Sequence, residues 1–335
     1  MKKVLIILTG GTITSAEGDD GLAPVPGRGI LDELSDCGDL CEILTMGLFA
    51  LDSTDIGPGQ WQEMVCAVCG SYEDCDGFVL LHGTDTMAYT AAALSFALAG
   101  IGKPVILTGA QIPLGMPFSD ARRNMRDAVC AACSDHIAGV YVVFDGALIK
   151  GTRAVKADAR GMHAFVSSDG HTAGRIEGTD VILETPESLV SAASAWDASY
   201  RPECRNSFEE GVRLIKVYPG MDAGLLSAEN AAACGIRAVV RETFGLGGVP
   251  ERLTESVKKL TQAQIAVFAA SQCVYGGTDL GVYSVGARAQ AAGVVSAQTM
   301  SAQTAAVKLM WILGQTHDAQ RIRELFLEDI AGELS

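Results

Sequence analysis

The sequence lacks the features that mark membrane-spanning and nucleic-acid-binding proteins. No stretch reaches the run of about 18 uncharged apolar residues that a membrane-spanning helix needs. Lys and Arg number 25 against 40 Asp and Glu, form no dense cluster and leave a net charge of −15. Because nucleic acid and anionic lipid are bound through basic patches, we expect neither nucleic acid nor a membrane as a partner.

The chain also lacks the glycine-rich motifs of nucleotide-binding proteins. A glycine turn follows the first apolar run, but residues 10–13 have no third glycine as in GxGxxG, and no GxxxxGK[ST] loop occurs. The run itself, residues 4–8, is too short for the apolar core of a secretory leader. We therefore expect a cytoplasmic protein that binds no nucleotide.

Cysteine is plentiful, with ten residues, yet its arrangement does not favour a metal site. Two pairs have two-residue gaps, Cys66/Cys69 and Cys130/Cys133, and both lie in alanine-rich, helix-like stretches. Neither pair has the glycine turn of a zinc knuckle or a His at ligand spacing. We expect buried free thiols in a reducing compartment.

Apolar runs alternate with helical patterns along the first half of the chain. The runs are at 4–8, 77–81, 105–108 and 140–144, and the helical patterns at 60–69, 86–99 and 120–133. This alternation predicts βαβ units and a mostly parallel sheet, and the continuous apolarity of the runs predicts that both faces are covered. We expect Thr84 or Asp85 to cap the helix at 86–99.

Length and pattern predict two domains. A chain of 335 residues is long enough for about two domains of ordinary size. The pattern weakens between about 188 and 209 and then resumes with a strand-like run at 212–218. We predict an N-terminal α/β domain at 1–190, a linker at 191–210 and a smaller C-terminal α/β domain at 211–335.

Three turns at predicted strand ends carry the chemistry. They are Thr9-Gly10-Gly11-Thr12, Asp52-Ser53-Thr54-Asp55 and His82-Gly83-Thr84-Asp85. Ligands of open α/β sheets bind beyond the carboxyl ends of the strands, so these turns are expected to converge on one crevice. The first turn presents the best nucleophile candidate, the Thr12 hydroxyl. The second offers two hydroxyls and two carboxylates, which suit a small zwitterion.

A threonine hydroxyl needs a base or a polarising partner before it attacks a carbonyl. Lys156 follows the run at 140–144 by a connection that can return it to the crevice, where it would act beside Asp85 as a proton shuttle. Each signal also has a structural interpretation: ordinary turn chemistry for residues 9–12, helix capping for residues 52–55 and a solvated side chain for Lys156. We assign His82 no catalytic role.

Together these motifs resemble the asparaginase family, specifically its cytoplasmic type I branch. The resemblance covers nearly the whole chain, and the segment from His82 to Thr90 is its most specific part. It rests on residues 9–12, 51–54, 82–90, 103–113, Lys156, 218–220 and 332–334.

The resemblance implies an amidohydrolase that converts its small-molecule substrate, L-asparagine, and water to L-aspartate and ammonia. The reaction would pass through a threonyl acyl-enzyme and need no metal or organic cofactor. The implied catalytic residues are Thr12 as first nucleophile and Thr84, Asp85 and Lys156 as a second cluster. The implied substrate contacts are Asp52, Ser53 and Thr54 at the carboxylate end, Thr84, and Asp85 at the α-ammonium. Turn amides are natural donors to the developing oxyanion.

The implied fold is α/β, with a larger N-terminal domain built on a mostly parallel, flavodoxin-like sheet and a smaller C-terminal α/β domain. Family members form homodimers that often pair into homotetramers. One departure concerns the loop after Thr12, where the family usually carries a catalytic tyrosine and this sequence has Leu22. If Thr12 is activated, another group must take that part; Tyr275, Tyr283 and Asp279 are candidates.

Two other functions remain open from sequence. One is a related amidase that prefers another amide such as L-glutamine, because one methylene changes binding by only about 1–3 kcal/mol. The other is a catalytically silent amino-acid-binding protein or amidotransferase subunit. The change at Leu22 favours silence, and the Thr12, Thr84, Asp85 and Lys156 set opposes it.

Overall fold

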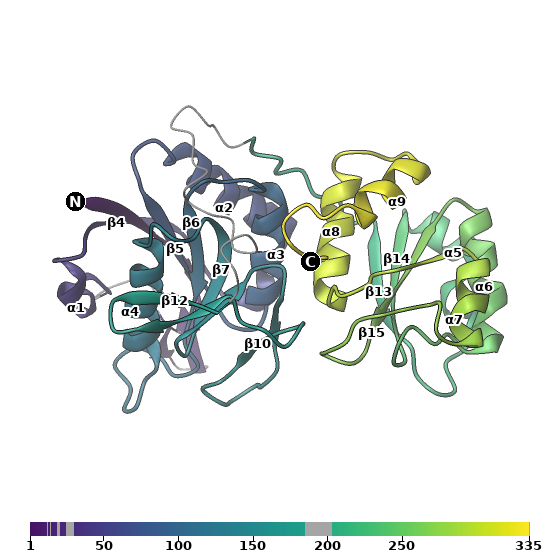
Figure 1. Ribbon diagram of the computed structural model, residues 1–335, viewed down its shortest axis with the longest axis horizontal. Coiled ribbons are helices and arrows are strands. Elements are labelled where there is room, and N and C mark those ends of the chain that lie inside the picture. Colours follow the sequence, from purple (N-terminus) through teal and green to yellow (C-terminus); the bar gives the residue numbers. More distant parts are fainter. Residues whose placement is uncertain (12, 14, 19–20, 25–29, 185–202, 335) are drawn as a thin grey trace. The chain divides into compact units, whose positions relative to one another are not determined.

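The computed structural model describes residues 1–11, 13, 15–18, 21–24, 30–184 and 203–334, which form two compact units (Figure 1). The first unit comprises Met1–Ser167 and His171–Asn206, and the second Ser168–Gly170 and Ser207–Ser335. The predicted linker at 191–210 lies largely outside the described residues.

The first unit is built on an eight-stranded sheet with the order β12-β11-β8-β7-β6-β5-β1-β4. Its parallel strands are β1 (Lys2–Gly10), β4 (Cys41–Leu51), β5 (Gly77–Leu81), β6 (Pro104–Thr108) and β7 (Gly139–Phe144). Its antiparallel extension is β8 (Ala147–Lys150), β11 (Gly174–Glu177) and β12 (Asp180–Leu183). In chain order the parallel strands run 2-1-3-4-5, the flavodoxin-like arrangement, so the mostly parallel sheet is confirmed.

Helices cover both faces of this sheet (Figure 1). On one side lie α2 (Pro58–Gly70) and α3 (Met87–Ala97), and on the other α4 (Ala121–Ala132) packs with the short α1 (Ile30–Glu33). Every residue of β5 and β6 is buried, as their unbroken apolarity predicts. Two small antiparallel pairs lie outside the sheet: β2 (Ser15–Gly18) with β3 (Gly21–Pro24), and β9 (Ala154–Lys156) with β10 (Phe165–Ser167).

The cap predicted for α3 is wrong. The helix begins at Met87 with Thr86 as its N-cap, and no side chain makes a capping hydrogen bond. Asp85 instead pairs with Lys156, and the Thr86 hydroxyl donates to the Ser53 carbonyl oxygen over 2.6 Å. The polar residues at this helix start therefore connect the turn to other segments.

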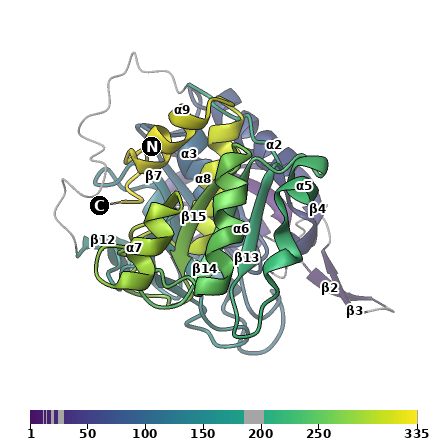
Figure 2. The ribbon, with the colours of Figure 1, turned by 90° about the vertical axis from the view of Figure 1, so that its right-hand side faces the viewer.

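The second unit is a smaller layered α/β domain, as predicted. Its four-stranded parallel sheet has the order β13-β14-β15-β16, made of Val212–Lys216, Ala238–Thr243, Ala266–Ser271 and Val294–Ser296. The helices α5 (Ala228–Ala233), α6 (Glu251–Gln262) and α7 (Ser284–Ala291) cover one face, and α8 (Ala302–Leu313) with α9 (Ala319–Leu327) covers the other (Figures 1 and 2).

A buried ion pair connects α8 to the segment that follows α9 in the second unit. Lys308 of α8 and Glu333 are both fully buried and form a salt bridge. The Lys308 ammonium also donates to the Phe326 and Glu328 carbonyl oxygens, at 2.9 and 2.6 Å. Burial lowers the pKa of Lys308, and the Glu333 carboxylate opposes that shift. The segment after α9 is thus anchored in the core of the unit.

Expectations for cysteine are partly wrong. Cys69 and Cys204 are joined by a disulfide, so these two are not free thiols. Cys37, Cys41, Cys75 and Cys130 are buried and are not part of a disulfide. Among the described residues, no group of three or more His, Cys, Asp and Glu side chains is arranged to hold a metal ion. Nor does that part of the chain contain a helix long and apolar enough to cross a membrane.

Candidate active site

The three predicted turns leave one edge of the first sheet. Strands β1 and β5 pair in parallel from Val4 opposite Gly77 to Leu8 opposite Leu81, so the turns that follow them start side by side. Strand β4 flanks β1 on its other side and ends at Leu51, opposite Gly10. The strand order reverses between β1 and β5, and the carboxyl ends at such a switch point are where ligands bind in open α/β sheets.

Glycine allows these turns to touch backbone to backbone. Gly11 has a φ of +84°, and a Cβ there would lie 2.3 Å from the Gly83 backbone nitrogen. A Cβ on Gly83 would in turn lie 2.6 Å from the Ser53 hydroxyl oxygen. A side chain at either glycine would force the turns apart. Because glycine has none, the turns that follow three strands can lie in contact.

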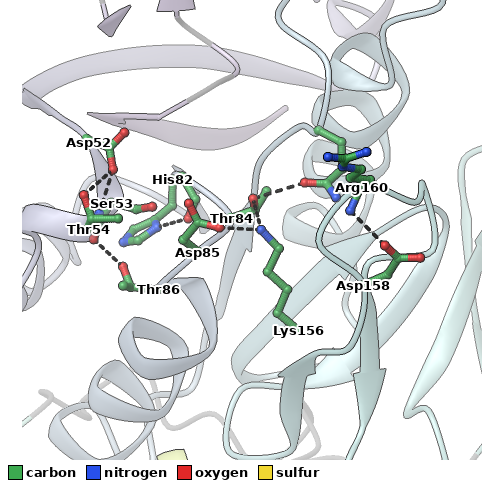
Figure 3. Close-up of polar contacts among 12 residues, drawn as sticks. Asp52, Ser53, Thr54, His82, Thr84, Asp85, Thr86, Lys156, Asp158 and Arg160 are labelled. Atoms are coloured by element: carbon green, nitrogen blue, oxygen red, sulfur yellow. Dashed lines mark hydrogen bonds and ion pairs between the residues drawn. The ribbon is translucent and has the colours of Figure 1, made fainter. Parts of the chain in front are cut away.

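A lysine joins two residues of the third turn (Figure 3). The Lys156 ammonium donates to the Thr84 hydroxyl over 2.8 Å and pairs with an Asp85 carboxylate oxygen at 2.6 Å. The Thr84 residue is only 6% exposed, whereas the Asp85 side chain is 61% exposed. The structure thus brings Thr84, Asp85 and Lys156 together, with the hydroxyl enclosed and part of the carboxylate open to a ligand.

The sequence analysis missed a partner of this cluster, Gln111. The Thr84 hydroxyl donates to the Gln111 side-chain oxygen over 3.2 Å, and the Gln111 side-chain amide donates to the Gly161 carbonyl oxygen over 3.2 Å. Gln111 lies just after β6, and the Asp120 carboxylate holds its backbone amide. Its position beyond a strand of the same sheet edge is the signal that could have found it.

The second turn is held mostly by its own side chains. Asp52 caps the 3₁₀ turn Ser53–Asp55 and accepts from the Thr54 backbone amide over 2.8 Å and from its hydroxyl over 2.7 Å (Figure 3). These bonds, the amide first, lower the pKa of Asp52. Ser53 is 3% exposed and lies against Gly83. The capping interpretation therefore describes Asp52, while Ser53 lies against the third turn.

His82 belongs to a buried chain of hydrogen bonds. Its Nδ1 lies 2.7 Å from the Gly83 carbonyl oxygen, which only accepts, so Nδ1 carries the proton and Nε2 accepts from the Thr90 hydroxyl at 2.9 Å. The Trp61 indole donates to that same hydroxyl over 3.1 Å. Burial lowers the pKa of His82 to about 4 and keeps the ring neutral. These contacts hold in place the residue at which the third turn begins.

Three further expectations concern the first turn and the loop that follows it. Thr12 lies outside the described residues, while the Thr9 hydroxyl is buried and donates to the Leu81 carbonyl oxygen over 2.8 Å. The Gly11 amide, a turn amide expected to serve a developing oxyanion, donates to the Leu51 carbonyl oxygen over 3.1 Å. Leu22 is paired through its backbone with Glu17 in the β2–β3 hairpin.

Family models match both halves of the chain. The model described as "Asparaginase, N-terminal" matches residues 3–188, and "Glutaminase/Asparaginase C-terminal domain" matches residues 211–326.

Individual relatives agree over nearly the full length. An L-asparaginase of Thermococcus kodakarensis is 36% identical over 338 residues, covering 99% of each chain. The solved structure of a thermostable L-asparaginase from that organism has a TM-score of 0.89, with 34% identity and 99% of each chain covered. A subunit of the glutamyl-tRNA(Gln) amidotransferase of Pyrococcus horikoshii is 36% identical over 345 residues, which cover 99% of this chain and 76% of the relative. The chain therefore belongs to the asparaginase family of amidohydrolases.

Proposed function

We propose that the protein hydrolyses L-asparagine to L-aspartate and ammonia through a threonyl acyl-enzyme. The observation that carries this proposal is the Lys156 ammonium, which joins the Thr84 hydroxyl to the Asp85 carboxylate at the switch point of the sheet. A hydroxyl, a potential base and an open carboxylate are the groups that amide hydrolysis of a zwitterion requires. Similarity to L-asparaginases over 99% of the chain supports the choice of substrate.

The first step forms the acyl-enzyme. The Thr12 hydroxyl attacks the side-chain amide carbon of asparagine, its proton passes to the amide nitrogen, and the C–N bond breaks with ammonia as the leaving group. Thr12 follows Gly11 directly, and Gly11 touches the backbone of Gly83, the residue before Thr84. That contact supports a reaction in which the two threonines act on the same carbonyl from neighbouring turns.

The second step releases aspartate. Water attacks the acyl carbon and its proton passes to the Thr84–Lys156 pair; the ester C–O bond then breaks, and the pair returns the proton to the Thr12 oxygen. When Lys156 is neutral it accepts the proton of the Thr84 hydroxyl, reversing the direction of their 2.8 Å hydrogen bond. Asp85 stabilises the lysine each time it becomes charged. Positioned acid–base groups of this kind contribute roughly 10²- to 10⁴-fold in rate.

Substrate recognition uses the carboxylate of the third turn and the hydroxyls of the second. The exposed Asp85 carboxylate binds the α-ammonium, and the turn of Ser53 and Thr54 binds the α-carboxylate. Asp52 is itself an anion with a lowered pKa, so its part is to hold Thr54 in place and not to touch the substrate carboxylate.

The test is ammonia release from L-asparagine and, in parallel, from L-glutamine. We expect turnover of asparagine by the wild-type protein and a loss of at least about 100-fold in kcat for Thr12→Ala and for Thr84→Ala. Thr254→Ala in α6 is the matched control and should keep wild-type kcat. Equal turnover by Thr84→Ala and wild type would refute the proposal.

The same assay separates the alternatives. Faster release from glutamine would identify a related amidase with the other preference, since the two substrates differ by one methylene. No turnover of either amide, together with a melting temperature raised by asparagine, would identify a catalytically silent amino-acid-binding protein. In such a protein the Lys156–Thr84 contact would have no catalytic use.

Three further statements belong to the proposal. The reaction needs no metal or organic cofactor, so EDTA treatment should leave kcat unchanged. The active protein is a homodimer or homotetramer, which light scattering tests directly. The protein is located in the cytoplasm, which cell fractionation tests.

A further inference from the structure

Three cysteines gather around the end of α2, away from the turns that form the candidate active site. Cys66 and Cys69 are one helical turn apart in α2, so their side chains leave the same face of the helix. Cys69 is joined to Cys204 by a disulfide, while Cys66 is an exposed free thiol. A disulfide therefore has a third cysteine beside it on the same helix face.

A hydrogen bond holds the third cysteine against the segment that carries the disulfide partner. The Asn206 side-chain amide donates to the Cys66 sulfur over 3.2 Å, and Asn206 is two residues beyond Cys204. The backbone amide of Arg205 donates to the Ala97 carbonyl oxygen over 3.3 Å and fixes this segment at the end of α3. The sulfurs of Cys66 and Cys69 thus both face the segment of Cys204.

We propose that Cys66, Cys69 and Cys204 form a thiol–disulfide exchange site that reacts with low-molecular-weight thiols and disulfides of the glutathione class. Disulfides found in reducing compartments are typically transient, catalytic or redox-sensing, which fits a bond with a thiol and solvent beside it. Cys204 is exposed and Cys69 partly so, and an incoming thiol reaches the bond from solvent.

The exchange conserves atoms and electrons. The Cys66 thiolate attacks the Cys204 sulfur, a Cys66–Cys204 bond forms, and the Cys69–Cys204 bond breaks. Cys69 leaves as a thiolate and takes up the proton that Cys66 lost. An external thiolate that attacks Cys204 instead forms a mixed disulfide there and releases Cys69. Either helix cysteine can then attack Cys204, restore a protein disulfide and expel the external thiol.

The variant Cys69→Ser tests the reaction, because only Cys66 remains to resolve a mixed disulfide on Cys204. After treatment with oxidised glutathione, peptide mass mapping should find the Cys66–Cys204 disulfide and no glutathione kept on Cys204. The double variant Cys66→Ser/Cys69→Ser should keep one glutathione on Cys204. The matched control Cys69→Ser/Cys234→Ser removes a different exposed thiol and should still form the new disulfide.

Other outcomes overturn the proposal. If Cys69→Ser keeps glutathione on Cys204 to the same extent as the double variant, Cys66 does not exchange. If wild-type protein treated with oxidised glutathione contains neither a Cys69–Cys204 nor a Cys66–Cys204 peptide, the disulfide on which the site depends does not form. Circular dichroism of each variant establishes that the fold is intact when the thiols are mapped.

Discussion

The buried His82 predicts a specific dependence of stability on pH. His82 is fully buried, and its Nε2 accepts a hydrogen bond, so the ring is built into the fold in its neutral form. Desolvation lowers its pKa to about 4 from 6.5, and the Gly83 carbonyl opposes the shift only in part. The variant that tests this is His82→Asn. Asparagine keeps a side-chain amide donor near the position of Nδ1 but has no group that titrates in this pH range.

The magnitude and sign follow from proton linkage. Between pH 6.5 and pH 4 the unfolded chain binds a proton at this position and the folded chain does not, so stability rises with pH in that window. The stabilisation is complete above pH 6.5 and is lost as the pH falls towards 4. A shift from 6.5 to about 4, at about 1.4 kcal/mol per pKa unit, corresponds to about 3 kcal/mol.

The assay is urea-induced unfolding followed by circular dichroism at several pH values between 4 and 7. The free-energy difference between wild type and His82→Asn should shrink by about 3 kcal/mol from pH 7 to pH 4, because carboxylates titrate alike in both proteins. His136→Asn, at an exposed position after α4, is the control and should run parallel to wild type. Parallel curves for wild type and His82→Asn would refute the reasoning.

Two further substitutions test packing at the core and at the turns. Lys308→Met leaves the buried Glu333 carboxylate without its lysine and should lower the unfolding free energy by about 3–5 kcal/mol in thermal unfolding; a loss below about 1 kcal/mol would contradict the buried pair. Gly11→Ala places a Cβ 2.3 Å from the Gly83 backbone and should reduce kcat by at least about tenfold, whereas Gly59→Ala in α2, where a Cβ meets nothing within 4 Å, should not; equal kcat values would show that the turns can separate without cost.

The sequence predicted the strands that are buried on both faces. Strands such as β5 and β6 are continuous apolar runs because helices cover both sides, and that pattern is local. The antiparallel extension was not predicted, because β8, β11 and β12 are four-residue strands with part of their surface exposed. Short half-exposed strands have little apolar periodicity, and only their pairing with neighbours identifies them.

In the candidate site, too, features with a local sequence signal were easier to predict than features set by long-range contacts. The turn that contains Thr84 could be placed at a strand end from local pattern. Its contact with Lys156 spans 72 residues, and Lys156 was expected there only from the connection after the run at 140–144, which the family resemblance then supported. The disulfide between Cys69 and Cys204, 135 residues apart in sequence, had no local signal. Helix capping at α3 failed for a related reason, because long-range partners took the side chains that local rules assign to the cap.

The buried pair of Lys308 and Glu333 has a consequence for biosynthesis. During translation α8 leaves the ribosome before residue 333, so Lys308 at its centre has no carboxylate to pair with until Glu333 has emerged. The first sheet, by contrast, has all its strands once Leu183 has emerged. Domains generally fold in the order of synthesis, so we expect the first unit to form its sheet before the second, whose core is complete only after residue 333 has emerged.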